Sequence, residues 1–193
     1  MYDLFFQHIN KQVPLTAEEE EFIKPYLKLK KVRKKQYLLQ EGEVCKTVCF
    51  VSKGALRQYY IDENGSEKIV QFALEGWTMG DLFSFFTGEP SQYNIDALED
   101  SEVILIDRKA FDELTEKVRK FETYGRLMIT RAYIALQKRL TSMISFTVEE
   151  RYEQLLKQYP DIVQRVPQHM IASYMGLTPE TLSRARKRAA AKK

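Results

Sequence analysis

The residues best suited to chemistry lie in the stretch GLTPETLSRARKR, residues 176–188. The guanidinium of Arg184 can donate two hydrogen bonds to O6 and N7 of guanine, and the carboxylate of Glu180 can accept one from N4 of cytosine. The basic residues that follow suit phosphate groups, whose neutralisation supplies much of the affinity of DNA-binding proteins. The predicted DNA-contacting residues are Thr178, Pro179, Glu180, Thr181, Ser183, Arg184, Lys187 and Arg188.

A helix-turn-helix would hold these residues on one face. Two helices packed across a tight turn need a small residue where they cross and favour a glycine in the turn, and Ala172 and Gly176 occupy those places. Thr178 suits the N-cap of the second helix, and Pro179 suits its first turn. Apolar residues have the spacing of a small core: Ile171, Met175, Leu177, Leu182 and Ala185. Residues 168–187 therefore predict a helix-turn-helix, with a hairpin that serves only as packing as the alternative.

The charge distribution points to the same end of the chain. The net charge is +3, but residues 165–193 hold seven Lys or Arg and one acid, Glu180, so the other residues are net acidic. A basic segment on a slightly acidic body suits a polyanion. The alternative is a ligand-binding or scaffold module whose basic tail binds a membrane or nucleic acid without sequence preference. That alternative needs charge but neither Ala172 nor Gly176.

Few residues suit metal or thiol chemistry. The histidines are His8 and His169, and the cysteines are Cys45 and Cys49. Two cysteines without partnering histidines do not make a zinc site or a disulfide framework. A cupin-type metal enzyme would need histidines inside the barrel, where there are none. We therefore expect no catalytic residues, no metal and no enzyme; the cysteines are either reduced thiols or a redox sensor.

No membrane or secretory segment is expected either. The first residues lack a basic start followed by an apolar core, and no apolar run approaches membrane-spanning length. These patterns predict a cytoplasmic protein without a membrane partner.

Short stretches rich in Val, Ile, Phe and Tyr, separated by turn residues, occupy residues 28–107. The clearest pair flanks Asn64 and Gly65, a typical hairpin turn. The pattern predicts an antiparallel sandwich or barrel. Thr16 suits the N-cap of a helix before it, and Asp107 that of a short helix after it.

A long helix is expected over residues 121–144, followed by a helix with a capping box of Thr147 and Glu150. Two apolar sets with a spacing of seven run along the long helix: Phe121, Met128 and Ala135, and Ile129, Leu136 and Met143. This coiled-coil-like pattern indicates packing on the sheet, or on both the sheet and a second subunit, and we favour the latter.

The whole chain resembles the Crp–Fnr family of bacterial transcription regulators. The stretch LLQEGEVCKTVCFVSKGALRQYYIDENGSEKIVQFALEGWTMGDLFSF is similar to the family's cyclic-nucleotide-binding β-roll, and GLTPETLSRARKR resembles its recognition helix. The resemblance implies an α+β fold: an antiparallel double-stranded β-roll in residues 1–120, a dimerisation helix and hinge in 121–145, and a helix-turn-helix domain in 146–193. It also implies that Glu180 and Arg184 contact base edges, while Pro179 replaces an arginine that many members carry.

The family's nucleotide pocket is only partly matched. Its Gly-Glu-Leu motif is Gly80-Asp81-Leu82 here, and the place of its phosphate-binding arginine falls on Ser91. No Lys or Arg occurs between residues 68 and 108. Burying a cyclic phosphate without a cation costs several kcal/mol, which argues against tight cyclic AMP binding. The candidate effector-pocket residues are Gly80, Asp81, Leu82, Ser91, Gln92 and Gln137.

These features together predict a homodimeric, sequence-specific, DNA-binding transcription regulator. Its expected partners are a near-palindromic DNA duplex, a second copy of the chain and RNA polymerase. A small effector other than cyclic AMP would control it, or it would be constitutive with its pocket filled by Trp77 or phenylalanine side chains. The chain also ends without the β-hairpin wing that family members often carry.

Overall fold

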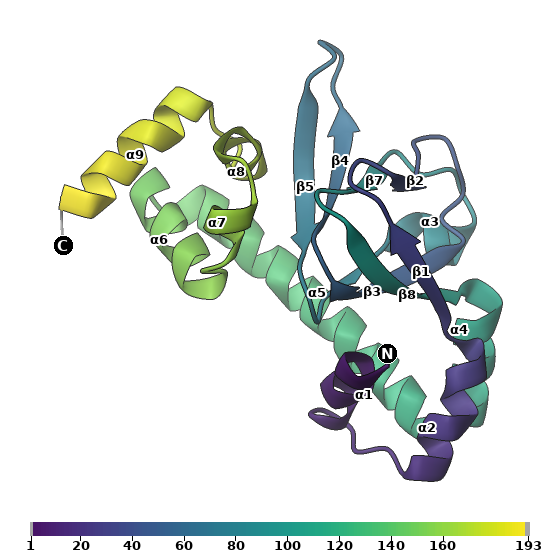
Figure 1. The fold of residues 1–193 in the computed structure, drawn as a ribbon. Coiled ribbons are helices and arrows are strands. Elements are labelled where there is room, and N and C mark those ends of the chain that lie inside the picture. The colour runs from purple at the N-terminus through teal and green to yellow at the C-terminus, as the bar shows by residue number, and fades with distance from the viewer. Residues whose placement is uncertain (1, 192–193) are drawn as a thin grey trace.

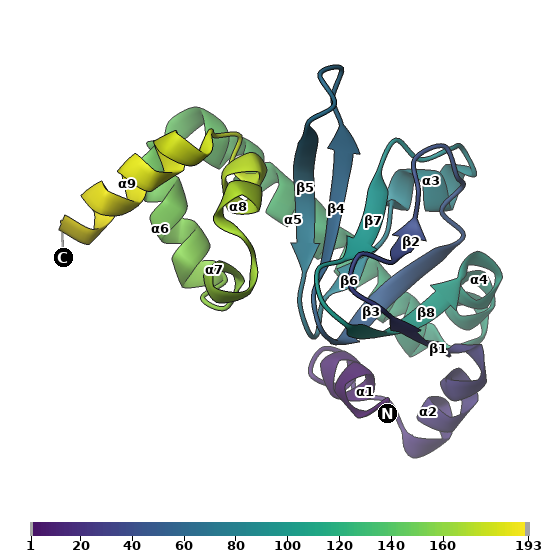
Figure 2. The same cartoon turned by 45° about the horizontal axis from the view of Figure 1, so that its top comes forward.

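The computed structural model describes residues 2–191 and contains a β-roll, a long helix and a C-terminal helical region (Figures 1 and 2). The strands are β1 (Lys28–Val32), β2 (Tyr37–Leu39), β3 (Thr47–Lys53), β4 (Leu56–Ile61), β5 (Glu67–Ala73), β6 (Thr78–Met79), β7 (Asn94–Ala97) and β8 (Ser101–Asp107). The helices are α1 (Asp3–Asn10), α2 (Ala17–Ile23), the 3-10 helix η1 (Lys24–Tyr26), α3 (Leu82–Thr87), α4 (Arg108–Lys117), α5 (Arg119–Ser145), α6 (Val148–Gln158), α7 (Ile162–Arg165), α8 (Gln168–Tyr174) and α9 (Pro179–Ala191).

The strands form two four-stranded antiparallel sheets within the described residues, in the orders β1-β8-β3-β6 and β2-β7-β4-β5. The predicted hairpin joins β4 to β5. The carboxylate of Asp62 accepts hydrogen bonds from the backbone N–H groups of Asn64 and Ser66, and Gly65 has a φ of 75°. Glycine adopts this left-handed conformation without steric cost, so the turn closes where the sequence indicates.

The N-terminal helices cover one end of the roll. Thr16 and Glu19 form a capping box at the start of α2, which confirms the expected N-cap. Helix α1 was not predicted from the sequence. This helix of 8 residues buries Phe5, Phe6 and Ile9 in the core of the roll. An element this short is stabilised mainly by burial, which a local pattern does not show.

Helix α5 runs past the roll and leads to the C-terminal helices (Figure 1). Its first turns bury Phe121, Tyr124 and Gly125 against the core. A Cβ at Gly125 would lie 3.4 Å from the ring of Phe111, so the small residue allows α4 and α5 to pack closely. From Ile129 onward, the apolar side chains of α5 are exposed.

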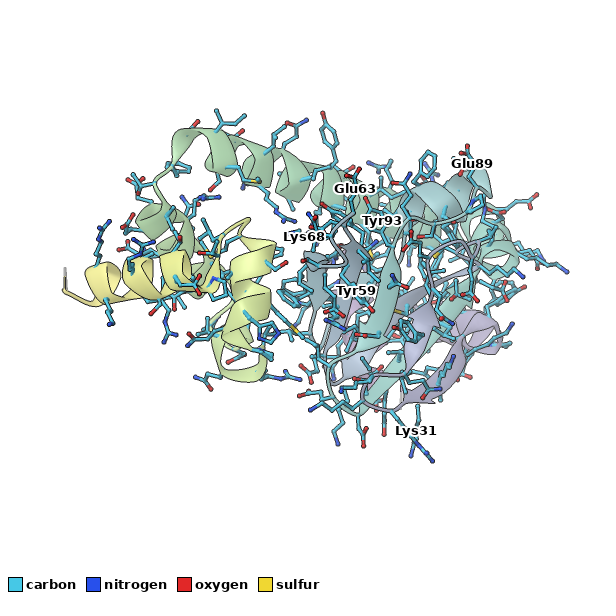
Figure 3. All side chains as sticks on the ribbon, turned by 90° about the horizontal axis from the view of Figure 1, so that it is seen from above. Lys31, Tyr59, Glu63, Lys68, Glu89 and Tyr93 are labelled. Carbon is cyan, nitrogen blue, oxygen red and sulfur yellow. The ribbon has the colours of Figure 1, made fainter. Side chains whose placement is uncertain are left out.

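The C-terminal helices share a second core with the roll. It joins buried residues of β4 and β5, including Tyr59, Ile69 and Phe72, to residues of α6 to α9. Figure 3 shows α8 beside the roll and α9 extending away from it, with Lys68 of β5 on the side of the roll that faces α8. No helix among the described residues is long and apolar enough to cross a membrane.

Candidate nucleic-acid interface and effector site

The helix-turn-helix is formed by α8, a tight turn and α9. Ala172 is fully buried where the helices cross, and its carbonyl accepts a hydrogen bond from the N–H of Leu177 at 2.8 Å. Gly176 has a φ of 69°, the left-handed conformation of a helix C-terminus. The hydroxyl of Thr178 accepts a hydrogen bond from the N–H of Thr181 at 3.2 Å and caps α9. The predicted small core is buried, with Leu177 partly so.

The predicted DNA-contacting residues lie together on α9 and its N-cap. Thr181 is half-buried, and the others are exposed: Thr178, Pro179, Glu180, Ser183, Arg184, Lys187 and Arg188. Arg188 donates a hydrogen bond to the carboxylate of Glu149 at 3.2 Å, which attaches α9 to α6. The pKa of Glu180 is lowered, first by its own backbone N–H and then by the Thr178 hydroxyl and the charge of Arg184. Glu180 is therefore an ionised acceptor one helical turn from a strong donor.

Two arginines outside this face hold the turn in place. Arg139 of α5 donates hydrogen bonds to the carbonyl of Tyr174 at 2.9 Å and to that of Val70 in β5 at 2.5 Å. Arg151 of α6 donates to the carbonyl of Met175 at 3.2 Å. Cations at a helix C-terminus compensate its unpaired carbonyls and its dipole. Neither arginine was predicted to hold the turn, because nothing in the spacing of Arg139 and Arg151 indicates which carbonyls they would meet.

The helix-turn-helix is docked on the roll by polar contacts. The hydroxyl of Ser173 in α8 accepts from the N–H of Ile69 at 2.9 Å and donates to the carbonyl of Glu67 at 3.1 Å, so it pairs with β5. Arg165 of α7 forms ion pairs with Glu75, at 2.6 Å, and with Glu99. These contacts hold α7 and α8 against the β-roll.

The stretch from Gly80 to Gln92 is the part of the chain that resembles the family's nucleotide motif, and it is called the cassette below. Internal hydrogen bonds occupy its buried polar side chains. The carboxylate of Asp81 accepts hydrogen bonds from the N–H groups of Phe83 at 3.1 Å and Ser84 at 3.3 Å, and so caps α3. Its second oxygen accepts from the hydroxyl of Ser91 at 2.7 Å, and both side chains are buried. Asp81 and Ser91, which the sequence predicted to lie in one pocket, are therefore in contact. Their polar groups bind each other, however, and neither residue offers a positive charge to a ligand.

The remaining candidate effector-pocket residues do not form one site. Gly80 and Leu82 line a groove between the roll and α5, whereas Gln92 is exposed. The amide of Gln137 donates to the hydroxyl of Tyr133 at 2.9 Å on exposed α5, and Gln137 does not line the groove. A Cβ at Gly80 would lie 3.0 Å from Val48, so this position accepts only glycine without a shift.

The roll does contain a buried arginine, but its charge is neutralised. The guanidinium of Arg57 in β4 donates to both oxygens of buried Asp96, at 2.7 and 2.9 Å, and also pairs with Glu67. It stacks over the ring of Tyr59 with 4.2 Å to the centroid. A bidentate pair of this kind leaves no free charge for a phosphate.

The groove has a volume of about 1020 Å³ and extends from α1 along α5 to α6. Its wall includes Trp77 and several phenylalanines: Phe5, Phe50, Phe72, Phe85, Phe86, Phe111 and Phe121. These aromatic rings line the groove and leave its volume open.

The cysteines lie near this groove as thiols. Cys45 and Cys49 are free and buried, and burial raises both pKa values, that of Cys49 to about 12. A thiol of such high pKa has little thiolate, the form that reacts with oxidants. No cluster of His, Cys, Asp or Glu suited to a metal ion occurs among residues 2–191.

Comparison with known proteins agrees with this architecture. Residues 29–118 match the family model of the cyclic nucleotide-binding domain. The chain is 27% identical over 186 residues to the Fumarate and nitrate reduction regulatory protein of Vibrio cholerae, which covers 89% of this chain and 74% of that protein.

Solved structures share the fold. FixK2 from Bradyrhizobium japonicum matches 86% of this chain and 85% of its own, with a TM-score of 0.73 and 20% identity. A structure from Eubacterium rectale assigned to the Crp/Fnr family matches 92% of this chain and 85% of its own, with a TM-score of 0.68 and 14% identity. Residues 29–118 therefore match a cyclic nucleotide-binding domain, and the chain is similar over most of its length to transcriptional regulators of the Crp/Fnr family, whose fold it shares.

Proposed function

We propose that this regulator is a homodimer that binds a near-palindromic DNA site through α9 and responds to a small effector other than cyclic AMP. The family implies DNA binding and dimerisation; the sequence-specific site, the dimer seam and the nature of the effector are our proposals. RNA polymerase is the proposed further partner at the promoter.

The observation that carries the DNA-binding proposal is the exposed face of α9. Arg184 makes no ion pair among the described residues, so its guanidinium is free to bind a base edge. Glu180 is ionised one turn before it. An isolated basic helix would bind phosphates without preference, whereas an acid beside an arginine repels phosphate and favours a particular base.

The proposed dimer seam lies along α5. Ile129, Tyr133, Leu136, Leu140 and Met143 are between 44 and 64% exposed. They are separated alternately by four and three residues, which is the a/d spacing of a coiled coil. Covering such a stripe with the same stripe of a second copy would remove the largest run of exposed apolar side chains from water.

The effector proposal rests on the charges of the roll. A cyclic phosphate placed at the cassette would face Asp81 and Ser91, which already bind each other. The buried Arg57 is held by two carboxylates. Burial of a phosphate without a free cation costs several kcal/mol, so tight cyclic AMP binding is not expected.

Selection from a random duplex library tests the DNA-binding proposal. We expect one enriched near-palindromic sequence, and Arg184→Ala to lose about 1–3 kcal/mol of binding and relax selectivity at one position per half-site. Lys187→Ala is the matched control, because loss of a phosphate contact weakens binding to all duplexes equally. Equal weakening by both variants, with no enriched sequence, would instead support a non-specific basic module.

A further inference from the structure

Buried polar groups without partners gather at the α1 end of the groove. Tyr124 of α5 is 3% exposed, and its hydroxyl has no hydrogen-bond partner within residues 2–191. The hydroxyl of Thr78 lies close enough to Tyr124 to lower its pKa, which burial raises overall, but it donates to the sulfur of Met128 at 3.7 Å. The side-chain oxygen of Gln12 in α1 is likewise buried and unpartnered among these residues. Such groups cost free energy until a ligand or a movement satisfies them.

These groups belong to one constellation. The amide nitrogen of Gln12 lies 2.9 Å from Nε2 of His8, and the His8 ring packs edge-on against Tyr124, with 6.1 Å between centroids. Arg131 lies two turns along α5 from Tyr124, and its charge acts on both His8 and Tyr124. Arg131, whose side chain is exposed, lines the same groove as Tyr124 and His8.

Among the described residues, the charged side chains that line the groove are all positive. Its described lining includes the five cations Arg131, Lys138, Arg139, Arg151 and Lys157, and neither Asp nor Glu. The lining also includes apolar side chains, among them Phe5, Phe50, Met128 and Phe121, whose ring lies 6.1 Å from that of Tyr124 between centroids. A cavity with an apolar wall and a few convergent donors is typical of a small-molecule site. Its positive charge without a counter-charge favours an organic anion.

We propose that the groove binds an organic anion, an apolar body with a single carboxylate, whose carboxylate accepts hydrogen bonds from Tyr124 and Arg131. Because the Tyr124 hydroxyl is buried in the unliganded chain, entry of the ligand requires the side chains that cover it to move. The site is separate from the closed Asp81–Ser91 cassette. Its role as the effector site rests on the proposed function, whereas binding itself does not.

Binding of such a ligand would connect three parts of the molecule. The site joins α1, the roll and the first half of α5, and the same helix carries Arg139, which holds the turn of the helix-turn-helix. A ligand that binds one arrangement of α1 and α5 more tightly would shift the population toward it. The position of α9 would then change through α5.

The test uses calorimetric titration of the full chain with 2-naphthoate and with its neutral analogue 2-naphthamide. We expect saturable naphthoate binding, weakened about tenfold by Arg131→Gln and about fivefold by Tyr124→Phe, which removes only the hydroxyl. Lys157→Gln at the far end of the groove is the matched control and should leave naphthoate affinity unchanged. Naphthamide should bind more weakly and be insensitive to Arg131→Gln. Thermal melts establish that each variant is folded.

Naphthoate binding that is absent, equal to naphthamide binding, or unaffected by both Arg131→Gln and Tyr124→Phe would overturn the proposal. Binding of the selected duplex is measured on the same samples. Normal duplex binding without naphthoate binding would reject this site alone, whereas naphthoate binding without selective duplex binding would reject the proposed DNA function alone.

Discussion

Asp81 connects the start of helix α3 to Ser91 in the loop that follows it. Its carboxylate caps α3 through the N–H groups of Phe83 and Ser84 and accepts a hydrogen bond from Ser91. The carboxylate of Asp81 therefore stabilises the fold of this chain. Ser91, which lies where the resemblance places a phosphate-binding arginine, donates an internal hydrogen bond to Asp81 instead.

Replacement of Asp81 by alanine is expected to destabilise the roll by about 2 kcal/mol, because it removes an N-cap and leaves the buried Ser91 hydroxyl without its acceptor. For a chain of this size, the melting temperature should fall by roughly 5 °C. Asp112→Ala is the control, since this exposed carboxylate makes only a surface pair with Arg108. Its effect should stay within about 0.5 kcal/mol. Equal effects of the two variants would contradict the structural role of Asp81.

His8 is expected to make the stability depend on pH. Its pKa is lowered from 6.5, first by burial and then by the charges of Arg131 and Lys11, and it also faces Gln12 and Tyr124. The unfolded chain therefore binds more protons just below pH 6.5, and stability is lost as the pH falls through the lowered folded pKa. Urea unfolding at pH 7.5, 6.5 and 5.5 measures this loss. His8→Gln should reduce the loss of stability between pH 7.5 and 5.5, and His169→Gln should not. A reduction by His169→Gln and not by His8→Gln would contradict the assignment of this loss to His8.

The elements of the C-terminal region are capped by residues that a sequence reveals. Thr147 and Glu150 form the expected capping box of α6, Thr178 caps α9, and Gly176 takes the left-handed conformation. Such caps are local, so spacing alone predicts them. The strands, the hairpin and helix α5 were also predicted, the latter beginning at Arg119 rather than at Phe121.

Long-range partners explain what the sequence did not predict. Helix α1 is held by burial against the roll, and Arg139 and Arg151 meet carbonyls far along the chain. Ser173 of α8 pairs with β5, a contact that no local pattern predicts. The family resemblance placed Asp81 and Ser91 in one candidate pocket, but it did not predict that the two side chains bind each other.

Gly176→Ala tests the turn as an element. A Cβ meets no atom within 4 Å there, so its cost of about 1 kcal/mol should come from the backbone conformation alone. Gly176→Asn should cost less, because asparagine tolerates the left-handed region. Thermal unfolding of the two variants measures the difference. An alanine variant as stable as the parent would mean that the turn relaxes to another conformation.

The whole molecule is an assembly of a roll, a long helix and a helix-turn-helix that share contacts across their boundaries. We retain the division at residues 120 and 145 as a proposal. The ion pairs of Arg165 and the Ser173 contacts bind the last part to the first in this arrangement. A shift of α5 would therefore either break the contacts of Arg165 and Ser173 with the roll or move the roll together with the C-terminal helices.

Leu140→Lys is expected to convert the dimer to monomers, because a charge at the centre of the proposed seam would be buried against its copy. Sedimentation at micromolar concentration measures the change. Leu140→Met keeps the seam apolar and should remain dimeric. A Leu140→Lys variant that sediments as the parent does would place the dimer contact elsewhere.

Hydroxyl-radical footprinting of the full chain on the selected duplex tests the central claim most directly. Two copies of α9 in successive major grooves should protect two half-sites about 34 Å apart, on one face of the DNA. Arg184→Ala should abolish both protections together at a concentration where Lys187→Ala retains them. A single protected segment, or protection that moves freely along any duplex, would contradict a dimeric regulator that reads DNA through α9.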